Sequence, residues 1–113
     1  MHAFDVLGDP VRRRLLELLS QGELSSGELT STVREEFEIT QPAVSQHLRI
    51  LRESGMAHVR AEGNRRLYSV DAESLRSVDR WLEPFRRFWE PKLAALETEI
   101  ARGKRQRRIE EER

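Results

Sequence analysis

The chain has 113 residues, 37% of them hydrophobic and 35% charged, and its 20 basic and 20 acidic residues give a formal net charge of zero. This length suits one domain with its own core rather than a two-domain enzyme, and the absence of cysteine excludes disulfides, thiolate metal sites and cysteine nucleophiles. No apolar run of about 18 residues and no export signal are present, so we expect a cytoplasmic protein that makes no membrane contact.

Two helices are predicted near the N-terminus. Asp9 and Pro10 start the first, because Asp is a favoured N-cap and Pro is tolerated at the first helical position. Its apolar residues recur at helical spacing until Gly22 and are Val11, Leu15, Leu18 and Leu19. The second helix opens at Ser25, which has the spacing of a capping box with Glu28.

A third helix is predicted from Thr40, which can cap a first turn that tolerates Pro42, to a C-terminal Gly55. Its buried side is formed by Val44, Leu48 and Leu51. The second and third helices, joined by a short connection, predict a helix-turn-helix.

After the third helix the apolar period changes from helical to alternating. Residues 56–62 and 66–70 flank the dipeptide Gly63-Asn64, which is typical of a two-residue hairpin turn. Between positions 41 and 66 lie five arginines and two glutamates, a net charge of +3 in a chain that is neutral overall. Such local charge favours association with an anionic partner.

The last helix is predicted to begin after Asp71 and to run to about residue 101. About 30 helical residues span roughly 45 Å, more than a domain this small can cover, so we expect a homodimer. The alternative is that the aromatic residues of this segment only fill the core of their own chain. Pro84 and Pro91 predict a kink or a break. The apolar segment 3–7 should add to the dimer seam, for which we name Phe4, Leu7, Trp81, Phe85, Phe88, Trp89, Leu93 and Leu96.

The exposed face of the third helix is small and polar. With its apolar stripe facing inward, the residues that point outward are Pro42, Ser45, Gln46, Arg49 and Glu53, with Gln41 at the leading edge. Glutamine can pair with adenine, arginine with guanine and serine with either. As the second helix of a helix-turn-helix followed by a basic hairpin, this face predicts insertion into the major groove of DNA.

Three segments together resemble the ArsR family of bacterial winged-helix repressors. They are Gly8–Leu19 (GDPVRRRLLELL), Gln41–Gly55 (QPAVSQHLRILRESG) and Gly63–Tyr68 (GNRRLY). The pair Phe88-Trp89 followed by Leu93 is similar to a metal-independent branch of that family. The resemblance implies a homodimer that binds an imperfect palindrome in double-stranded operator DNA and represses its own operon. Its DNA-binding positions fall on Gln41, Ser45, Gln46, Arg49, Asn64, Arg65 and Arg66.

The expected fold is mainly α with a small β-hairpin wing, a winged helix-turn-helix. We place this domain at residues 1–101, with the wing at about 56–70 and the dimerisation helix at about 71–101, followed by a charged, flexible tail at 102–113. One departure from the family pattern is the segment 33–40, which is a few residues longer than the usual turn and carries three acids.

No metal, cofactor or catalytic group is predicted. Of the three histidines, we interpret His47 as a packing or phosphate-contact residue and His58 as a solvent-facing strand residue, and Asp71 and Asp79 have no histidine near them in the last helix. Acidic neighbours such as Glu35-Glu36 indicate a solvated face rather than acid–base chemistry. The arginines at 12–14 suit either phosphate contacts or a solvated helix face.

Two other functions fit the pattern less closely. One is a protein-interaction module in which the winged helix is a scaffold and the aromatic last helix binds another protein. The other is an RNA-binding winged helix, which would prefer structured RNA to duplex DNA. The effector that would release DNA is not identified by the sequence, although a pocket beside Trp81 and Trp89 is where we expect it to act.

Overall fold

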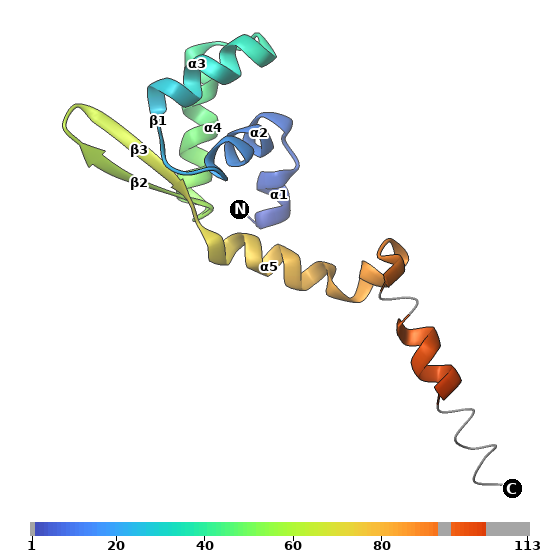
Figure 1. Cartoon of the computed structure of the whole chain (residues 1–113). Helices are drawn as coiled ribbons and strands as arrows, with labels where there is room; N and C mark the ends of the chain where they lie inside the picture. The colour runs from blue at the N-terminus through green and yellow to red at the C-terminus, as the bar shows by residue number, and fades with distance from the viewer. Residues whose placement is uncertain (1, 93–95, 104–113) are drawn as a thin grey trace, which may run out of the picture. The chain divides into compact units, whose positions relative to one another are not determined.

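The computed structural model describes residues 2–92 and 96–103, and it shows a mainly helical winged-helix fold with a small antiparallel sheet (Figure 1). The chain divides into two compact units, Met1–Val78 and Asp79–Arg113. In chain order the elements are α1 (Ala3–Leu7), α2 (Pro10–Leu19), β1 (Leu24–Ser25), α3 (Ser26–Phe37), α4 (Gln41–Glu53), β2 (Ala57–Glu62), β3 (Arg65–Val70), α5 (Ala72–Leu82) and the 3-10 helix η1 (Glu83–Phe88).

The predicted helix starts are confirmed by their side-chain caps. Asp9 Oδ1 accepts a hydrogen bond from the amide of Val11 at 2.8 Å, which satisfies one of the unpaired donors in the first turn of α2. Ser25 and Thr40 cap α3 and α4 in the same way, each accepting from the amide three residues further on. These caps fix where the two helices of the helix-turn-helix begin.

The long segment before α4 lengthens a helix rather than a loop. The helix α3 continues to Phe37, and only residues 38–40 connect it to α4. Glu38 adopts a left-handed conformation with φ of 53°, and its amide donates to the carbonyl of Arg34. The short connection keeps the helix-turn-helix compact although α3 is extended.

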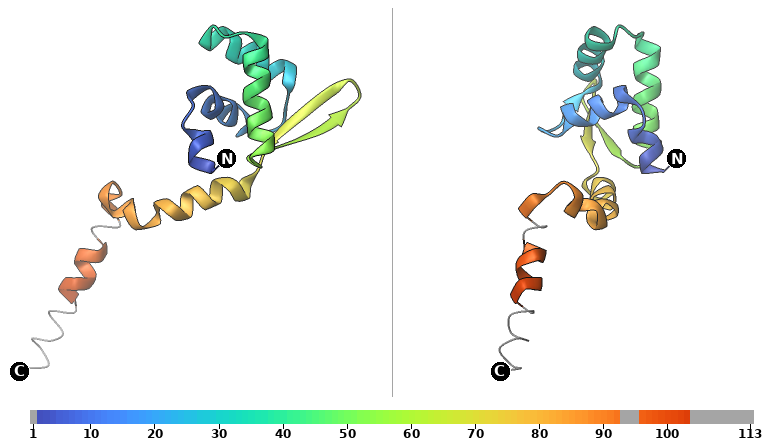
Figure 2. Two further views of the ribbon diagram at one scale, coloured as in Figure 1. Left: turned by 180° about the vertical axis from the view of Figure 1, so that it is seen from behind. Right: turned by 90° about the vertical axis from the view of Figure 1, so that its right-hand side faces the viewer.

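The core of the first unit lies where helices α1 to α4 meet the base of the sheet, and the β2–β3 hairpin extends away from it (Figure 2). Leu15, Leu29 and Leu51, one from each of α2, α3 and α4, are fully buried. Burial of each such side chain contributes about 1.5–3 kcal/mol. Val6 of α1 is fully buried in the same core, so the expectation that this part of the N-terminal segment adds to a dimer seam is wrong.

The sheet has three strands in the order β1-β3-β2, all antiparallel. The hairpin of β2 and β3 and its turn at Gly63 and Asn64 are confirmed, and Gly63 has the positive φ of 60° that such a turn requires. The strand β1 was not predicted, because two residues are too short to show an alternating pattern. Its Leu24 pairs with Tyr68, and its Ser25 pairs with Leu67.

The predicted break at Pro84 is confirmed. The α-helix ends at Leu82, and Pro84 lies in the first turn of η1, since proline has no amide to donate and its ring clashes with the carbonyl four residues earlier. Residues 91–92 and 96–103 are helical again, whereas Leu93 and positions 104–113 of the predicted tail lie outside the described residues. Within the described parts, no helix is both long and apolar enough to cross a bilayer.

Candidate nucleic-acid interface

The helix α4 presents the predicted polar face to solvent. Val44, Leu48 and Leu51 are buried, so the opposite side of the helix is exposed. On a helical wheel Gln46 points directly away from the buried stripe, whereas Gln41 and Ser45 face the side nearer to the hairpin. The exposed positions are Gln41, Ser45, Gln46 and Arg49.

His47 lies on the other edge of α4 and packs against the start of α2. Its Nδ1 is 3.3 Å from the guanidinium of Arg12 and 3.9 Å from a carboxylate oxygen of Asp9. Arg12 also donates to the backbone carbonyls of Val6 at 2.9 Å and Asp5 at 3.1 Å. Of the two roles considered for His47, the structure shows the packing contact.

The tip of the wing is exposed and basic. Asn64, Arg65 and Arg66 are all exposed, as predicted for residues that reach a DNA backbone. Arg65 lies 3.8 Å from the carboxylate of Glu28, but both side chains are more than half exposed. Exposed pairs of this kind stabilise a fold very little, so Arg65 can exchange this partner for a phosphate.

A hollow of about 560 Å³ lies between α3, α4 and β3. Four residues named from the sequence line it: Gln41, Ser45, Arg49 and Arg66. No acidic side chain of the described residues is among its lining. The rest of the lining is Ser26, Gly27, Thr30, Ser31, Arg34, Leu48, Arg52 and Tyr68.

A second hollow of about 390 Å³ adjoins the first on the wing side. It is lined by Arg52, Val59, Arg60, Ala61 and Arg66. Arg52 and Arg66 line both hollows, which therefore adjoin at these two side chains and together make a concave surface.

Sequence reasoning missed part of this surface. The sequence indicates Arg52 only as part of a basic stretch. It lies on the same face of α4 as Gln41, because the two residues are three helical turns apart. Arg34 belongs to α3 and reaches the hollow only because α3 packs beside α4, a tertiary relationship that no local pattern reveals.

Two arginines of the surface are paired with carboxylates. Arg49 Nε is 2.9 Å from Glu53, and this hydrogen bond lowers the pKa of the Glu53 carboxyl. Arg60 donates a bidentate pair of hydrogen bonds to the Glu23 carboxylate, at 2.8 and 3.1 Å, which lowers the pKa of Glu23. In the described residues Arg52 and Arg66 make no ion pair, although the charge of Arg52 helps, after Arg49, to lower the pKa of the neighbouring Glu53 carboxyl.

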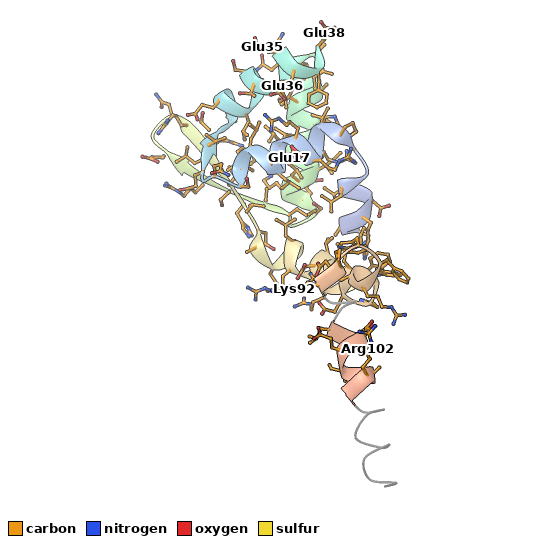
Figure 3. The ribbon with its side chains drawn as sticks, turned by 45° about the vertical axis from the view of Figure 1, so that its right-hand side comes forward. Glu17, Glu35, Glu36, Glu38, Lys92 and Arg102 are labelled. Carbon is orange, nitrogen blue, oxygen red and sulfur yellow. The ribbon has the colours of Figure 1, made fainter. Side chains whose placement is uncertain are left out.

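The arginines at 12–14 are engaged within the protein. Arg13 donates to the carbonyl of Leu7 at 2.7 Å. Arg14 binds both carboxylate oxygens of Glu36, at 2.8 and 3.0 Å, and lowers the pKa of that carboxyl. Figure 3 shows Glu36 beside Glu35 at the C-terminal end of α3. Glu35, Glu36 and Glu38, the three acids of the long segment, thus lie at the C-terminal end of α3.

His58 has a partner that was not expected. Its Nε2 lies 2.7 Å from the carboxylate of Asp71, so the statement that Asp71 has no histidine near it holds within the last helix but not in three dimensions. The other Asp71 oxygen accepts from the amide and hydroxyl of Ser74, as predicted for the cap of α5. The Ser74 hydroxyl, followed by His58, lowers the pKa of Asp71 to about 2. In the described residues no three histidine or acidic side chains form a group that could hold a metal ion.

Large apolar side chains are exposed at most of the positions named for the dimer seam. Phe88 is 71% exposed, Trp81 55% and Trp89 52%, values far above those of core residues. The rings of Trp81 and Phe85 contact each other in a tilted arrangement with centroids 4.9 Å apart, and both side chains remain exposed. Leu7, in contrast, is half-buried against the core of the first unit. The remaining exposed members are Phe4, Phe85 and Leu96.

Comparison with known proteins identifies relatives of this fold and surface. Residues 9–59 match the family described as bacterial regulatory protein, arsR family. The chain is 36% identical over 87 residues to the HTH-type transcriptional regulator Rv2034 of Mycobacterium tuberculosis, covering 77% of this chain and 75% of that relative. It is 30% identical over 84 residues to the transcriptional repressor SdpR of Bacillus subtilis, covering 74% and 89%. The crystal structure of the ArsR family transcriptional regulator RHA00566 is similar with a TM-score of 0.64 at 30% identity, covering 78% of this chain and 92% of that one.

Proposed function

This chain belongs to the arsR family of bacterial DNA-binding transcriptional regulators, and we propose that it represses its own operon as a homodimer bound to an imperfect palindrome. Members of the family are regulators rather than enzymes. The observation that carries the proposal is the exposed polar face of α4 beside a concave surface lined by arginines. Family membership favours DNA binding over the interaction module that the aromatic residues would also suit.

Each half of the interface has a distinct role in this proposal. Gln46, Ser45 and Gln41 read base edges from the major groove, with Arg49 at the border between bases and backbone. Asn64, Arg65 and Arg66 of the wing contact the backbone or the adjacent minor groove. His47, whose ring lies beside Arg12 and Asp9, is proposed to contact a phosphate at the edge of the interface.

Dimer formation is supported by the apolar side chains exposed in a single chain. A second copy of the same chain is the occupant that the proposal assigns to them, because a palindromic operator requires two α4 helices one helical turn of DNA apart, roughly 34 Å. Trp81, Phe88 and Trp89 then leave water on association, and each large side chain contributes about 1.5–3 kcal/mol.

We also propose that no metal controls this regulator. The chain has no cysteine with which to build the thiolate sites that soft metal ions prefer. We propose an effector other than a metal ion. Like any effector, it must bind the conformation that binds DNA and the conformation that releases DNA with different affinities. The region of Trp81 and Trp89 is the proposed place, and quenching of tryptophan fluorescence by a candidate effector, together with a change in DNA affinity, would support it.

A mobility-shift experiment with the DNA upstream of the protein's own gene tests the proposal. A discrete shift that weakens steeply between two salt concentrations is expected, because arginine–phosphate contacts release counterions. The double variant Arg65→Ala, Arg66→Ala should abolish the shift, whereas Arg76→Ala, which removes an exposed arginine from α5, should not. Retention of the shift in the wing variant, or a preference for structured RNA, would contradict the proposed docking.

A further inference from the structure

Five arginines form a continuous basic track along the concave side of the first unit. The track begins at Arg34 on α3, passes along α4 and ends on the wing strands. Its two hollows share Arg52 and Arg66, so a ligand in either hollow lies beside the same two side chains. The members of the basic track are Arg34, Arg49, Arg52, Arg60 and Arg66.

The position of the track between α4 and the wing decides what can occupy it. A helix in the major groove and a wing in the adjacent minor groove lie on opposite sides of one sugar–phosphate strand. That strand must cross the space between α4 and β3, and this space is where the two hollows lie. We propose that the basic track holds consecutive phosphates of the crossing strand, with Arg52 and Arg66 as its central contacts. The inference rests on the proposed function and adds phosphate-binding residues to it.

The chemistry of the lining suits phosphodiesters. Hydroxyl groups of Ser26, Thr30 and Ser31 line the first hollow, and each can donate to a phosphate oxygen. Arg34 is held over the turn between α3 and α4 by a hydrogen bond from its Nε to the carbonyl of Ile39, at 3.4 Å. Its remaining guanidinium donors are thereby left for a ligand. Tyr68 also belongs to the lining of this hollow, where it is almost fully buried.

Arg52 is the most informative residue of the track. It lines both hollows, it is half-buried, and it makes no ion pair in the part of the chain that the structure describes. Arg49 and Arg60 already have carboxylate partners, so a phosphate gains less from them than from a guanidinium that makes no ion pair. A neutral side chain at Arg52 should therefore remove a whole phosphate contact rather than release a competing acid.

The salt dependence of DNA binding tests the assignment. Each phosphate contact contributes about 0.9 to the slope of log affinity against log salt, so Arg52→Gln should reduce the slope by about 1.8 for a dimer. The affinity should fall by the same factor for the upstream DNA and for an unrelated duplex, because phosphates carry no sequence information. Arg52→Lys keeps the charge and should keep the slope. Arg76→Gln, the same charge change on α5, should leave slope and affinity unchanged.

A duplex series in which single phosphates are replaced by neutral methylphosphonates locates the contact. One substitution, in the strand between the read major groove and the adjacent minor groove, should weaken wild-type binding and leave Arg52→Gln binding unchanged. Additive losses at every position would overturn the assignment.

Three further outcomes separate this inference from the proposed function. If the wild-type chain binds its upstream DNA but Arg52→Gln behaves like Arg76→Gln, the strand does not cross the track and the inference fails while the function stands. If the wild type binds no duplex, the proposed function fails. Thermal stabilisation by inorganic phosphate without DNA that depends on Arg52, combined with an unchanged salt slope, would assign the track to a free anion instead and overturn the crossing strand.

Discussion

The guanidinium of Arg12 joins α1 to α4: it lies 3.3 Å from Nδ1 of His47 and donates to two carbonyls at the end of α1. The amides of Gly8 and Asp9 already donate to these carbonyls, at 3.3 and 3.5 Å, and the charged guanidinium adds a further hydrogen bond to each. Arg12 thus contacts α4 on the side opposite to the residues that we propose face DNA.

Replacing Arg12 should destabilise the fold and weaken DNA binding together. A hydrogen bond to a charged group contributes about 1.5–3 kcal/mol net of the bonds lost to water, so we expect Arg12→Ala to lower the free energy of unfolding by about 2 kcal/mol. Urea unfolding measures this loss. Arg13→Ala, which removes a single exposed bond to Leu7, serves as the control and should cost clearly less. Equal losses of unfolding free energy in both variants would show that the contacts of Arg12 with His47, Val6 and Asp5 stabilise the fold no more than the single bond of Arg13 does.

Asp71 should make stability depend on acid pH. Its pKa is lowered from 3.8 to about 2 in the folded protein by the Ser74 hydroxyl and by His58. The unfolded chain therefore binds this proton more readily, so the stabilisation is complete above a pH of about 4 and is lost as the pH falls through about 2. Melting temperatures of the wild type and Asp71→Asn should differ at pH 5 and converge towards pH 2. The exposed carboxylate Glu35, changed to glutamine, is the control and should show no such convergence.

Gln46 should control sequence discrimination rather than overall affinity. Each good base contact is worth about 1–3 kcal/mol, so Gln46→Ala should reduce the ratio of specific to nonspecific affinity by roughly 10-fold or more. Competition titrations with the operator and with scrambled duplex measure that ratio. Arg52→Gln, which acts on phosphates, should leave it unchanged. A Gln46 variant that lost affinity for both duplexes equally would place this side chain on the backbone.

The aromatic residues of the second unit should determine the oligomeric state. Phe88 and Trp89 are more than half exposed in one chain, and their removal from a dimer seam would cost about 3 kcal/mol or more, roughly a 100-fold increase in the dissociation constant. Analytical ultracentrifugation of the Phe88→Ser, Trp89→Ser double variant should show a shift from dimer to monomer. The melting temperature of the first unit should not change, and Arg87→Ser should sediment as the wild type does. A wild-type chain that sediments as a monomer would refute the dimer.

Much of the fold could be predicted because its signals are local. Asp9, Ser25 and Thr40 each hold an amide two or three residues away, and Gly63-Asn64 determines its own turn. A single window of sequence contains everything that such elements need. The exposed face of α4 follows from one helical period in the same way.

The parts that sequence reasoning missed depend on partners distant in the chain. His58 and Asp71 lie on different elements and meet only once β2 has paired with β3. Arg34 lines the same hollow as Arg66 because α3 packs beside α4. The strand β1 forms only by pairing with the edge of β3. None of these relationships leaves a periodic trace in the sequence.

Ser25 belongs to two structures at once, since it pairs with Leu67 in the sheet and its hydroxyl caps α3. The base of the wing and α3, the first helix of the helix-turn-helix, therefore share one residue that holds both in place. Engineers who transplant a wing between regulators of this kind should move the Leu24-Ser25 dipeptide along with the hairpin. A graft that begins at Ala57 would omit β1, so the transplanted β3 would lose the strand with which it pairs.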